Sequence, residues 1–490
     1  MYSLLVARSF GVSQSIAIYF AASSLYVSAQ HVLQVGALTA IFVPKYHQIK
    51  QDLGRESAFA AFSVLANWIL LVAGAVCSFG LIFSYPVVAW RIPGFQHSAI
   101  IEAHKMFLFI LPIIFLDTAS ALAKCIVNAE KMFGLPELIH AITKSAQLVS
   151  AFFLIAHFEA WGLVYSLILA AVIRFTWLLV ASFKSGYRHR LIFSSLEFHP
   201  RLLVSKLSLT WSYSMATQFY FFVFDAAISR ISEDAFALVK HLQRLLKTTQ
   251  SFLSRPASVV FFNSFSDAVS RKSQLAVQLI ITALQQHLAF FCTVLIFAIV
   301  AIDNLLELML SGETFSVHQV RKLSLFYVIG LPSILISFYG HVARGTTLAL
   351  GKTTSLYLLM IVAQLISGVL AFWLGKSMTM GMVILMMFAN AILLTIAPLV
   401  LLLASDRDKI RFYSPSFAAK WFVLGGFVIF TGLILEAFTE NIGLQNWAVT
   451  LILIFLCSLT VLSGSYVLKI SEITNLTNSL LRRFKRLSVG

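Results

Sequence analysis

Four basic side chains recur at helical spacing within one stretch of the chain, from residue 235 to residue 262. They are Lys240, Arg244, Lys247 and Arg255. If this stretch is an α-helix, the four side chains share one face, within about 80° of arc. A cation near the centre of a bilayer costs about 2.5–3.5 kcal/mol on insertion scales. We therefore expect this basic stripe to face water or an anion.

The chemistry of the basic stripe indicates a phosphate ligand. Ammonium and guanidinium groups spread over ~20 Å of helix, in a cavity of low dielectric constant, suit a diphosphate. An exporter of cations would instead need acidic side chains there. Arg8, in the first predicted span, either faces the same cavity or extends from a helix end to the membrane surface. The expected ligand is therefore a lipid carrier with an anionic head.

Few other charged side chains interrupt the apolar runs. Asp225 and Arg230 precede the basic stripe and lie near enough to pair with it or with each other. A structural ion pair and a coupling-ion site are both open interpretations of these two residues. Asp117 and Arg174 stand alone in their runs, which is typical of packing or helix-end residues.

The chain lacks the pattern of a catalytic or metal centre. The predicted extracytoplasmic loops hold no pair of acids, no His/Glu cluster and no Ser/His pairing. An enzyme that acts on a lipid-linked substrate would need such groups at the membrane surface. The four cysteines also lack the spacing of metal ligands. We expect no enzyme, no metal and no cofactor.

The composition is that of a membrane protein. Of 490 residues, 59% are hydrophobic and 11% are charged, and the mean hydropathy is +0.88. A soluble domain would carry about 25% charged residues. Apolar runs of spanning length recur from end to end, and they are continuous rather than alternating. We therefore predict an all-α polytopic membrane protein of about fourteen transmembrane helices, with the first helix truncated at its start.

A net charge of +16 raises the possibility of nucleic-acid binding, but the placement of the charges argues against it. Basic residues gather in alternate connections, at 45–55, 184–206, 271–272, 407–420 and 469–486. The connections between them, such as 83–103 and 437–446, are poor in Lys and Arg. This is the positive-inside pattern, with both termini cytoplasmic. The basic loops are expected to contact anionic membrane lipids and not nucleic acid.

A weak internal repeat appears when the chain is shifted against itself by about 220 residues. Pro112 then meets Pro332, and Phe95 meets Phe315. An offset of six spans predicts two parallel six-helix lobes, with a transport site between them. The predicted parts are an N-terminal lobe, a C-terminal lobe, an extra hairpin and a basic cytoplasmic tail, at residues 1–190, 191–411, 412–470 and 471–490.

Several motifs, in this order, resemble the MurJ/MviN lipid II flippases of the MOP exporter superfamily. They are LLVARSFGVS (4–13), VGALTAIFVPKY (35–46), IPGF (92–95), LPIIFLDTASALAKCIVNAEKMFGLPEL (111–138) and IGLPSILISFYGHVARGTTLALGKTT (329–354). The resemblance implies a V-shaped, two-lobed flippase in the bacterial cytoplasmic (inner) membrane. Its basic central cavity, lined by spans one, two, seven and eight, would receive an undecaprenyl-linked diphosphate sugar during peptidoglycan synthesis. Alternating access would then move the head group to the outer face.

The resemblance also assigns individual residues. Arg244 matches an essential arginine of the family on span eight, and Arg8 matches an arginine before its phenylalanine–glycine pair. Tyr2 and Ser3 stand where the family has an Arg-Asp pair. Two arginines and a glutamate of the family are also replaced, by Gln30, His31 and Val35. We therefore expect the cationic site to have shifted toward the basic stripe.

Two alternatives remain open at this point. An exporter of another undecaprenyl-linked oligosaccharide, such as an O-antigen or capsule unit, would use the same diphosphate. A transport-dead descendant could act as a scaffold, with cell-wall synthesis proteins as partners. The missing family arginines are the reason to consider both.

Overall fold

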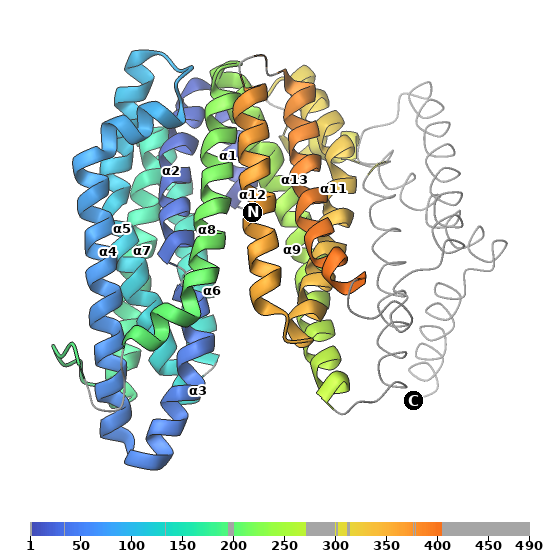
Figure 1. The fold of residues 1–490 in the computed structure, drawn as a ribbon. Coiled ribbons are helices and arrows are strands. Elements are labelled where there is room, and N and C mark those ends of the chain that lie inside the picture. The colour runs from blue at the N-terminus through green and yellow to red at the C-terminus, as the bar shows by residue number, and fades with distance from the viewer. Residues whose placement is uncertain are drawn as a thin grey trace, which may run out of the picture. The chain divides into compact units, whose positions relative to one another are not determined.

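The computed structural model describes residues 2–33, 35–132, 134–194, 200–270, 302–310, 314–375 and 379–403, with residues 299 and 377. Within these ranges all regular secondary structure is helical, as the sequence predicts (Figure 1). The helices are α1 (Tyr2–Phe10), α2 (Gln14–Leu33), α3 (Val35–Leu53), α4 (Arg55–Arg91), α5 (His97–Ala129), α6 (Gly134–Phe158), α7 (Ala160–Lys184), α8 (Pro200–Ser229), α9 (Glu233–Ser270), α11 (Val317–Ala349), α12 (Thr353–Leu374) and α13 (Met380–Leu403).

Eight of the described helices are long and apolar enough to cross a membrane. They are α2, α4, α5, α6, α7, α11, α12 and α13. The polytopic helical fold is thereby confirmed, whereas the count of fourteen spans stays a prediction. The predicted hairpin at 412–470 and the tail at 471–490 lie outside the described residues. Helices α8 and α9 also have spanning length but are not among these eight.

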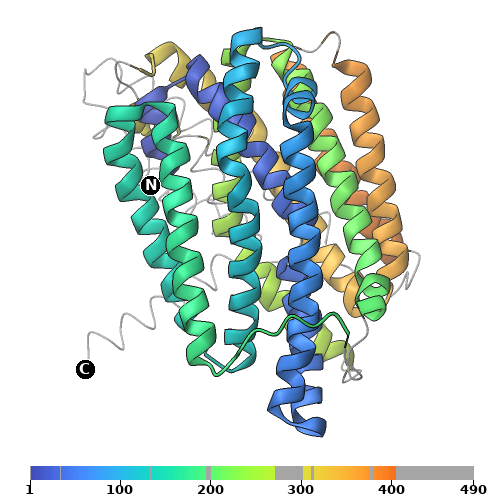
Figure 2. The same cartoon turned by 90° about the vertical axis from the view of Figure 1, so that its left-hand side faces the viewer.

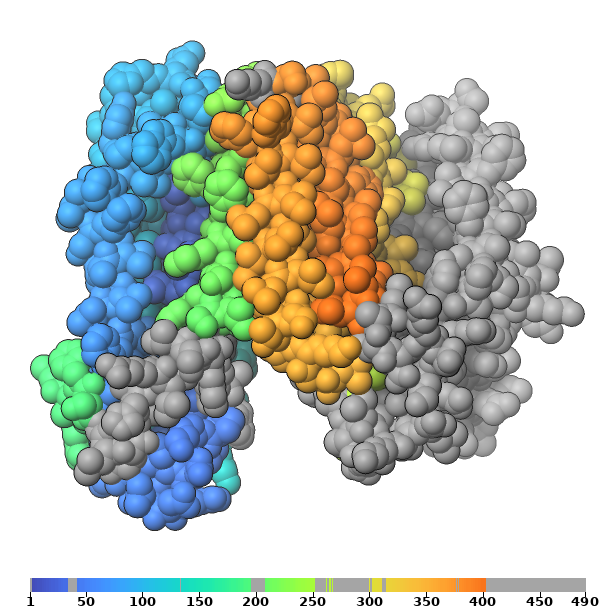
Figure 3. All heavy atoms as spheres, in the orientation of Figure 1, coloured from blue at the N-terminus to red at the C-terminus, as the bar shows by residue number. Residues whose placement is uncertain are grey.

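The surface of these helices is apolar where lipid would cover it. Helix α12, drawn in orange, presents its outer face in Figure 3. Its exposed side chains include Leu358, Val362, Leu365, Phe372 and Trp373. Exposed apolar surface of this extent is a liability in water and favourable against lipid tails. The exposed face of α12 is therefore suited to lipid.

The chain divides into two compact units. The first holds residues 1–240 and 364–382, and the second holds residues 241–363 and 383–490. The lobe boundary between residues 190 and 191 stays a prediction. In the first unit, α5 packs against both α4 and α7, and α6 forms a hairpin with α7 (Figures 1 and 2). Glycine permits that hairpin, because a Cβ at Gly162 would lie 2.5 Å from the backbone of Leu154.

The turn between α4 and α5 is much shorter than the sequence suggests. A connection at 83–103 was expected, but α4 continues through Pro86 to Arg91 and α5 begins at His97. This expectation was wrong because proline does not end a helix in a membrane when its surroundings satisfy the freed backbone groups. The short turn brings Arg91 to the end of a transmembrane helix.

Glu130, just after α5, joins three segments of the first unit. Its carboxylate accepts hydrogen bonds from Tyr46 at 2.5 Å, Lys50 at 2.7 Å and Arg55 at 2.9 Å. Burial alone would raise the pKa of this carboxyl. The hydrogen bonds from Lys50 and Tyr46 and the charge of Arg55 outweigh burial and hold the pKa below its usual value. The three partners fix the ends of α3 and α4 to the end of α5.

Candidate functional site

The basic stripe lies on one continuous helix, α9. Ser232 caps its start, because the Ala235 amide donates to the Ser232 hydroxyl at 3.0 Å. Glu233 and Asp234 occupy the first turn, where the helix dipole favours acids. Arg244 is half-buried and Lys247 is exposed, whereas the side chain of Arg255 lies outside the described residues. The four stripe positions therefore share α9, as their spacing predicts.

Lys240, the first residue of the basic stripe, forms an ion pair with Asp225. Its ammonium donates to Asp225 Oδ1 at 2.5 Å and lies 5.1 Å from the centre of the Phe236 ring. Only 12% of the Lys240 side chain is exposed. Asp225 therefore contacts the basic stripe, and Arg230, which is exposed, is not the partner of Asp225 in this ion pair.

Arg91 is a second partner of Asp225, and sequence analysis missed it. Its Nη2 lies 2.7 Å and its Nε 3.1 Å from Asp225 Oδ2. Its Nη1 also donates to the Ser28 hydroxyl at 3.3 Å. The side chains of Arg91 and Asp225 are 3% and 0% exposed. One signal was available: Arg91 is the last residue of a long apolar run, where an isolated cation needs an acidic partner.

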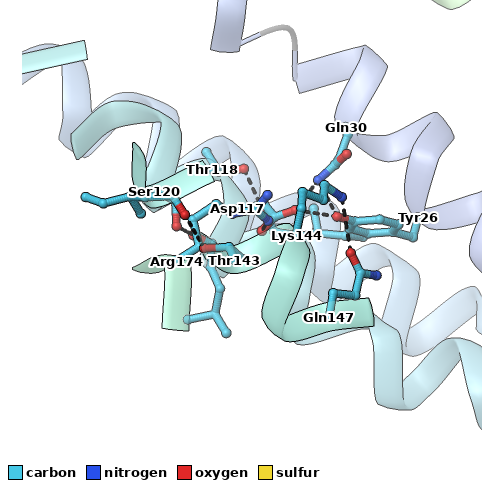
Figure 4. A network of polar contacts seen from close by, with 12 residues as sticks. Tyr26, Gln30, Asp117, Thr118, Ser120, Thr143, Lys144, Gln147 and Arg174 are labelled. Carbon is cyan, nitrogen blue, oxygen red and sulfur yellow. Dashed lines mark hydrogen bonds and ion pairs between the residues drawn. The ribbon is translucent and has the colours of Figure 1, made fainter. Parts of the chain in front are cut away.

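A second buried cluster joins α2, α5 and α7 (Figure 4). Asp117 forms an ion pair with Arg174 and also accepts hydrogen bonds from Tyr26 and Gln30. The Gln30 amide donates to the Tyr26 hydroxyl at 2.6 Å as well. The prediction that Asp117 and Arg174 stand alone was therefore wrong. Tyr26 and Gln30 are four residues apart on α2, a spacing that could have pointed to a shared polar partner.

A pocket of about 270 Å³ lies beside this cluster. Its polar lining consists of Gln30, Asp117, Thr118, Ser120, Lys124, His140 and Arg174. The Thr118 and Ser120 hydroxyls each donate to a backbone carbonyl of their own helix at 2.7 Å. Lys124 pairs with Glu137 at 2.7 Å. Gln30 and Arg174 bond Asp117, and the other three groups have partners outside the cluster. The cluster is therefore best understood as a structural network within the first unit.

The remaining predicted residues are placed as follows. Arg8 is exposed near the end of α1 in the first unit, whereas Arg244 and Lys247 belong to the second unit. In the part of the chain that the structure describes, no group of three or more His, Cys, Asp or Glu side chains could hold a metal ion. The basic side chains of α9 are of the types that bind anions.

Comparison with known proteins gives concordant results. A family model described as lipid II flippase MurJ matches residues 6–338. A probable lipid II flippase MurJ of Buchnera aphidicola is 24% identical over 186 residues, which cover 36% of this chain and 36% of that protein. The lipid II flippase MurJ of Burkholderia cenocepacia is 24% identical over 277 residues, covering 54% of this chain and 53% of that protein. The chain thus spans about half, or less, of the length of these relatives.

Solved structures show the same fold. A lipid II flippase MurJ in an inward closed conformation superposes with a TM-score of 0.78 at 16% identity, covering 96% of both chains. An inward-facing multidrug resistance transporter of the MATE family, in the MOP superfamily, gives 0.64 at 13% identity, covering 81% of this chain and 90% of that one. The fold is thus one shared by transporters.

Proposed function

Because the chain belongs to the lipid II flippase MurJ family, we propose that it moves lipid II across the bacterial cytoplasmic membrane by alternating access. The substrate would be the undecaprenyl-diphosphate-linked peptidoglycan precursor. The observation that carries this proposal is the basic stripe of α9. Several cations on one face of a membrane-protein helix carry a large free-energy cost unless they contact water or bind an anion. A diphosphate is the anion that lipid II carries.

The members of the basic stripe would have unequal roles. Arg244 is the main diphosphate ligand in this proposal, because a guanidinium can hold two phosphate oxygens at once. Lys247 and Arg255 follow Arg244 along α9 and would provide further contacts for the diphosphate. Arg8 on α1 would supply a further cation. Lys240 is held by Asp225 in the structure.

The arrangement favours transport over catalysis, because the family and its structural neighbours are transporters. We propose two lobes, at residues 1–190 and 191–411, that alternate around the site, with both termini cytoplasmic. Membrane lipids surround the protein, and cell-wall synthesis proteins are proposed partners.

A second candidate is an exporter of another lipid-linked oligosaccharide. Gln30 stands where the family has an arginine, and its amide is bonded to Asp117 and Tyr26. This position therefore contributes no cation, which favours a head group that needs fewer contacts than lipid II. A scaffold without transport activity is the third candidate, and it would not need the basic stripe.

Complementation tests the proposal. A strain depleted of its own lipid II flippase should grow when it carries the wild-type protein and should fail with Arg244→Ala, although the variant is inserted in the membrane. Arg230→Ala is the matched control, since Arg230 is an exposed arginine outside the basic stripe. Normal growth with Arg244→Ala would contradict the proposal that the basic stripe binds the substrate.

A further inference from the structure

The pocket beside Asp117 lies within the first unit, and its lining is more basic than acidic. Arg174 and Lys124 line it, and each is paired with a carboxylate: Arg174 with Asp117, and Lys124 with Glu137 at 2.7 Å. Each of these two pairs is electrically neutral. The pocket has a volume of about 270 Å³, whereas one water molecule needs only about 10–15 Å³. It is therefore large enough for a phosphate group.

Lys144 adds a positive charge beside this pocket. It follows the lining residue His140 by four positions on α6, so the two side chains share a face of the helix. Figure 4 shows it near Asp117, and its charge interacts with those of Asp117 and Arg174. Its ammonium donates to the Gln147 amide oxygen at 3.2 Å, and within the described part of the chain it forms no ion pair. Because the two pairs are neutral, Lys144 leaves the group with a surplus of positive charge.

Lys144 and Arg174 lie near the middle of their helices. Lys144 is ten residues from the start of α6, and Arg174 is ten residues from the end of α7. These two helix ends lie on the same side, because α6 and α7 form a hairpin. Ten residues of helix rise about 15 Å, which is half of the ~30 Å thickness of a bilayer core. A surplus cation at that depth carries a large free-energy cost unless it faces water or an anion.

Arg174 has a donor to spare for such an anion. Its Nη2 bonds Asp117, whereas its buried Nε has no hydrogen-bond partner among the described residues. Tyr26 and Gln30 also donate to Asp117, so this carboxylate does not need a further cation. A metal ion in the pocket would be repelled by Lys144 and Arg174, whereas phosphate oxygens would accept hydrogen bonds from both. The pocket is therefore suited to an anion.

We propose that this pocket is a phosphate site, made of other residues than the basic stripe. Lys144 and Arg174 hold the phosphate oxygens, and Lys124 and His140 line the part of the pocket nearer to the helix ends. The phosphate group belongs either to the head of an anionic membrane lipid or to a soluble phosphate ion. Asp117 and its partners then fix Arg174 in position for this ligand. The site does not depend on the proposed transport activity.

Calorimetric titration of the full-length protein in a maltoside detergent, which carries no phosphate, tests this site. The two probes are dihexanoyl phosphatidylglycerol and inorganic phosphate, added separately. Lys144→Met should weaken binding roughly tenfold, since one charge-assisted contact is lost, and Lys144→Arg should retain it. Lys45→Met is the matched control and should bind as the wild type does. Lys45 also donates to a glutamine three residues further on, at 3.2 Å, but it lies on α3 and does not line the pocket.

The probe that binds identifies the source of the phosphate. Binding of the lipid alone assigns the site to a lipid head group, and binding of inorganic phosphate assigns it to the ion. If neither probe binds, or if Lys144→Met and the wild type bind with equal affinity, the proposal is overturned. The effect of Lys144→Met should persist in an Arg244→Ala background, because Arg244 belongs to the second unit. A failure of the proposed function would therefore leave this result unchanged.

Discussion

The guanidinium of Arg91 lies 2.7 Å from the carboxylate of Asp225, and these residues are 134 positions apart in the chain. Their ion pair joins the end of α4 to α8, and both side chains are buried. Asp225→Ala removes the carboxylate that Arg91 and Lys240 share. We expect Asp225→Ala to lower the free energy of unfolding by about 3–5 kcal/mol.

Arg91→Ala should cost less than Asp225→Ala, because Lys240 still neutralises the carboxylate. Thermal unfolding of both variants in detergent measures this order. If the two variants lower the unfolding temperature by the same amount, the sharing of Asp225 between two cations is contradicted.

The ion pair of Asp117 and Arg174 gives a second prediction. Either Asp117→Asn or Arg174→Gln alone leaves one buried charge unpaired and should destabilise the protein by about 3–5 kcal/mol. The double variant removes both charges and should be more stable than either single variant. Lys124→Gln is the control, since its partner Glu137 is exposed and such pairs contribute little. If the double variant is destabilised by the sum of the two single effects, Asp117 and Arg174 are not energetically coupled.

Glu130 should make stability depend on acid pH. Its pKa is lower in the folded protein than its usual value, so its contribution is fully present above the unfolded-state pKa of about 4.3. The contribution is lost as the pH falls through the lower, folded-state value. The difference in unfolding temperature between wild type and Glu130→Gln should therefore be largest at pH 7 and shrink below about pH 4. A difference that grows on acidification would contradict this assignment.

Gly94, in the turn between α4 and α5, tests the close approach of that turn to the end of α8. A Cβ at this position would lie 2.2 Å from the Ser229 carbonyl oxygen, and the Gly94 amide donates to the Ser229 hydroxyl. We expect Gly94→Val to displace the turn and lower the unfolding temperature. Gly74→Ala is the control, because a Cβ there meets nothing within 4 Å. Gly94→Val with wild-type stability would show that the turn moves without cost.

The sequence predicted most of what periodicity and hydropathy can reveal. Continuous apolar runs predicted the helices, and the spacing of Lys240, Arg244 and Lys247 predicted that they share one helix. The pairing of buried charges could not be predicted in this way. Asp117 and Arg174 are 57 residues apart, and no local pattern tells which distant helix supplies the partner. Arg91 was missed for the same reason, and because it lies within the predicted connection at 83–103.

We propose above all that Arg244 binds the diphosphate of a lipid substrate that the protein moves across the membrane. Fluorescent lipid II, placed in the outer leaflet of vesicles that contain the purified protein, measures this directly through the accessibility of its head group. We predict movement by the wild type and by Arg230→Ala, and its loss in Arg244→Ala. Lipid II movement by Arg244→Ala at the wild-type rate would contradict the account.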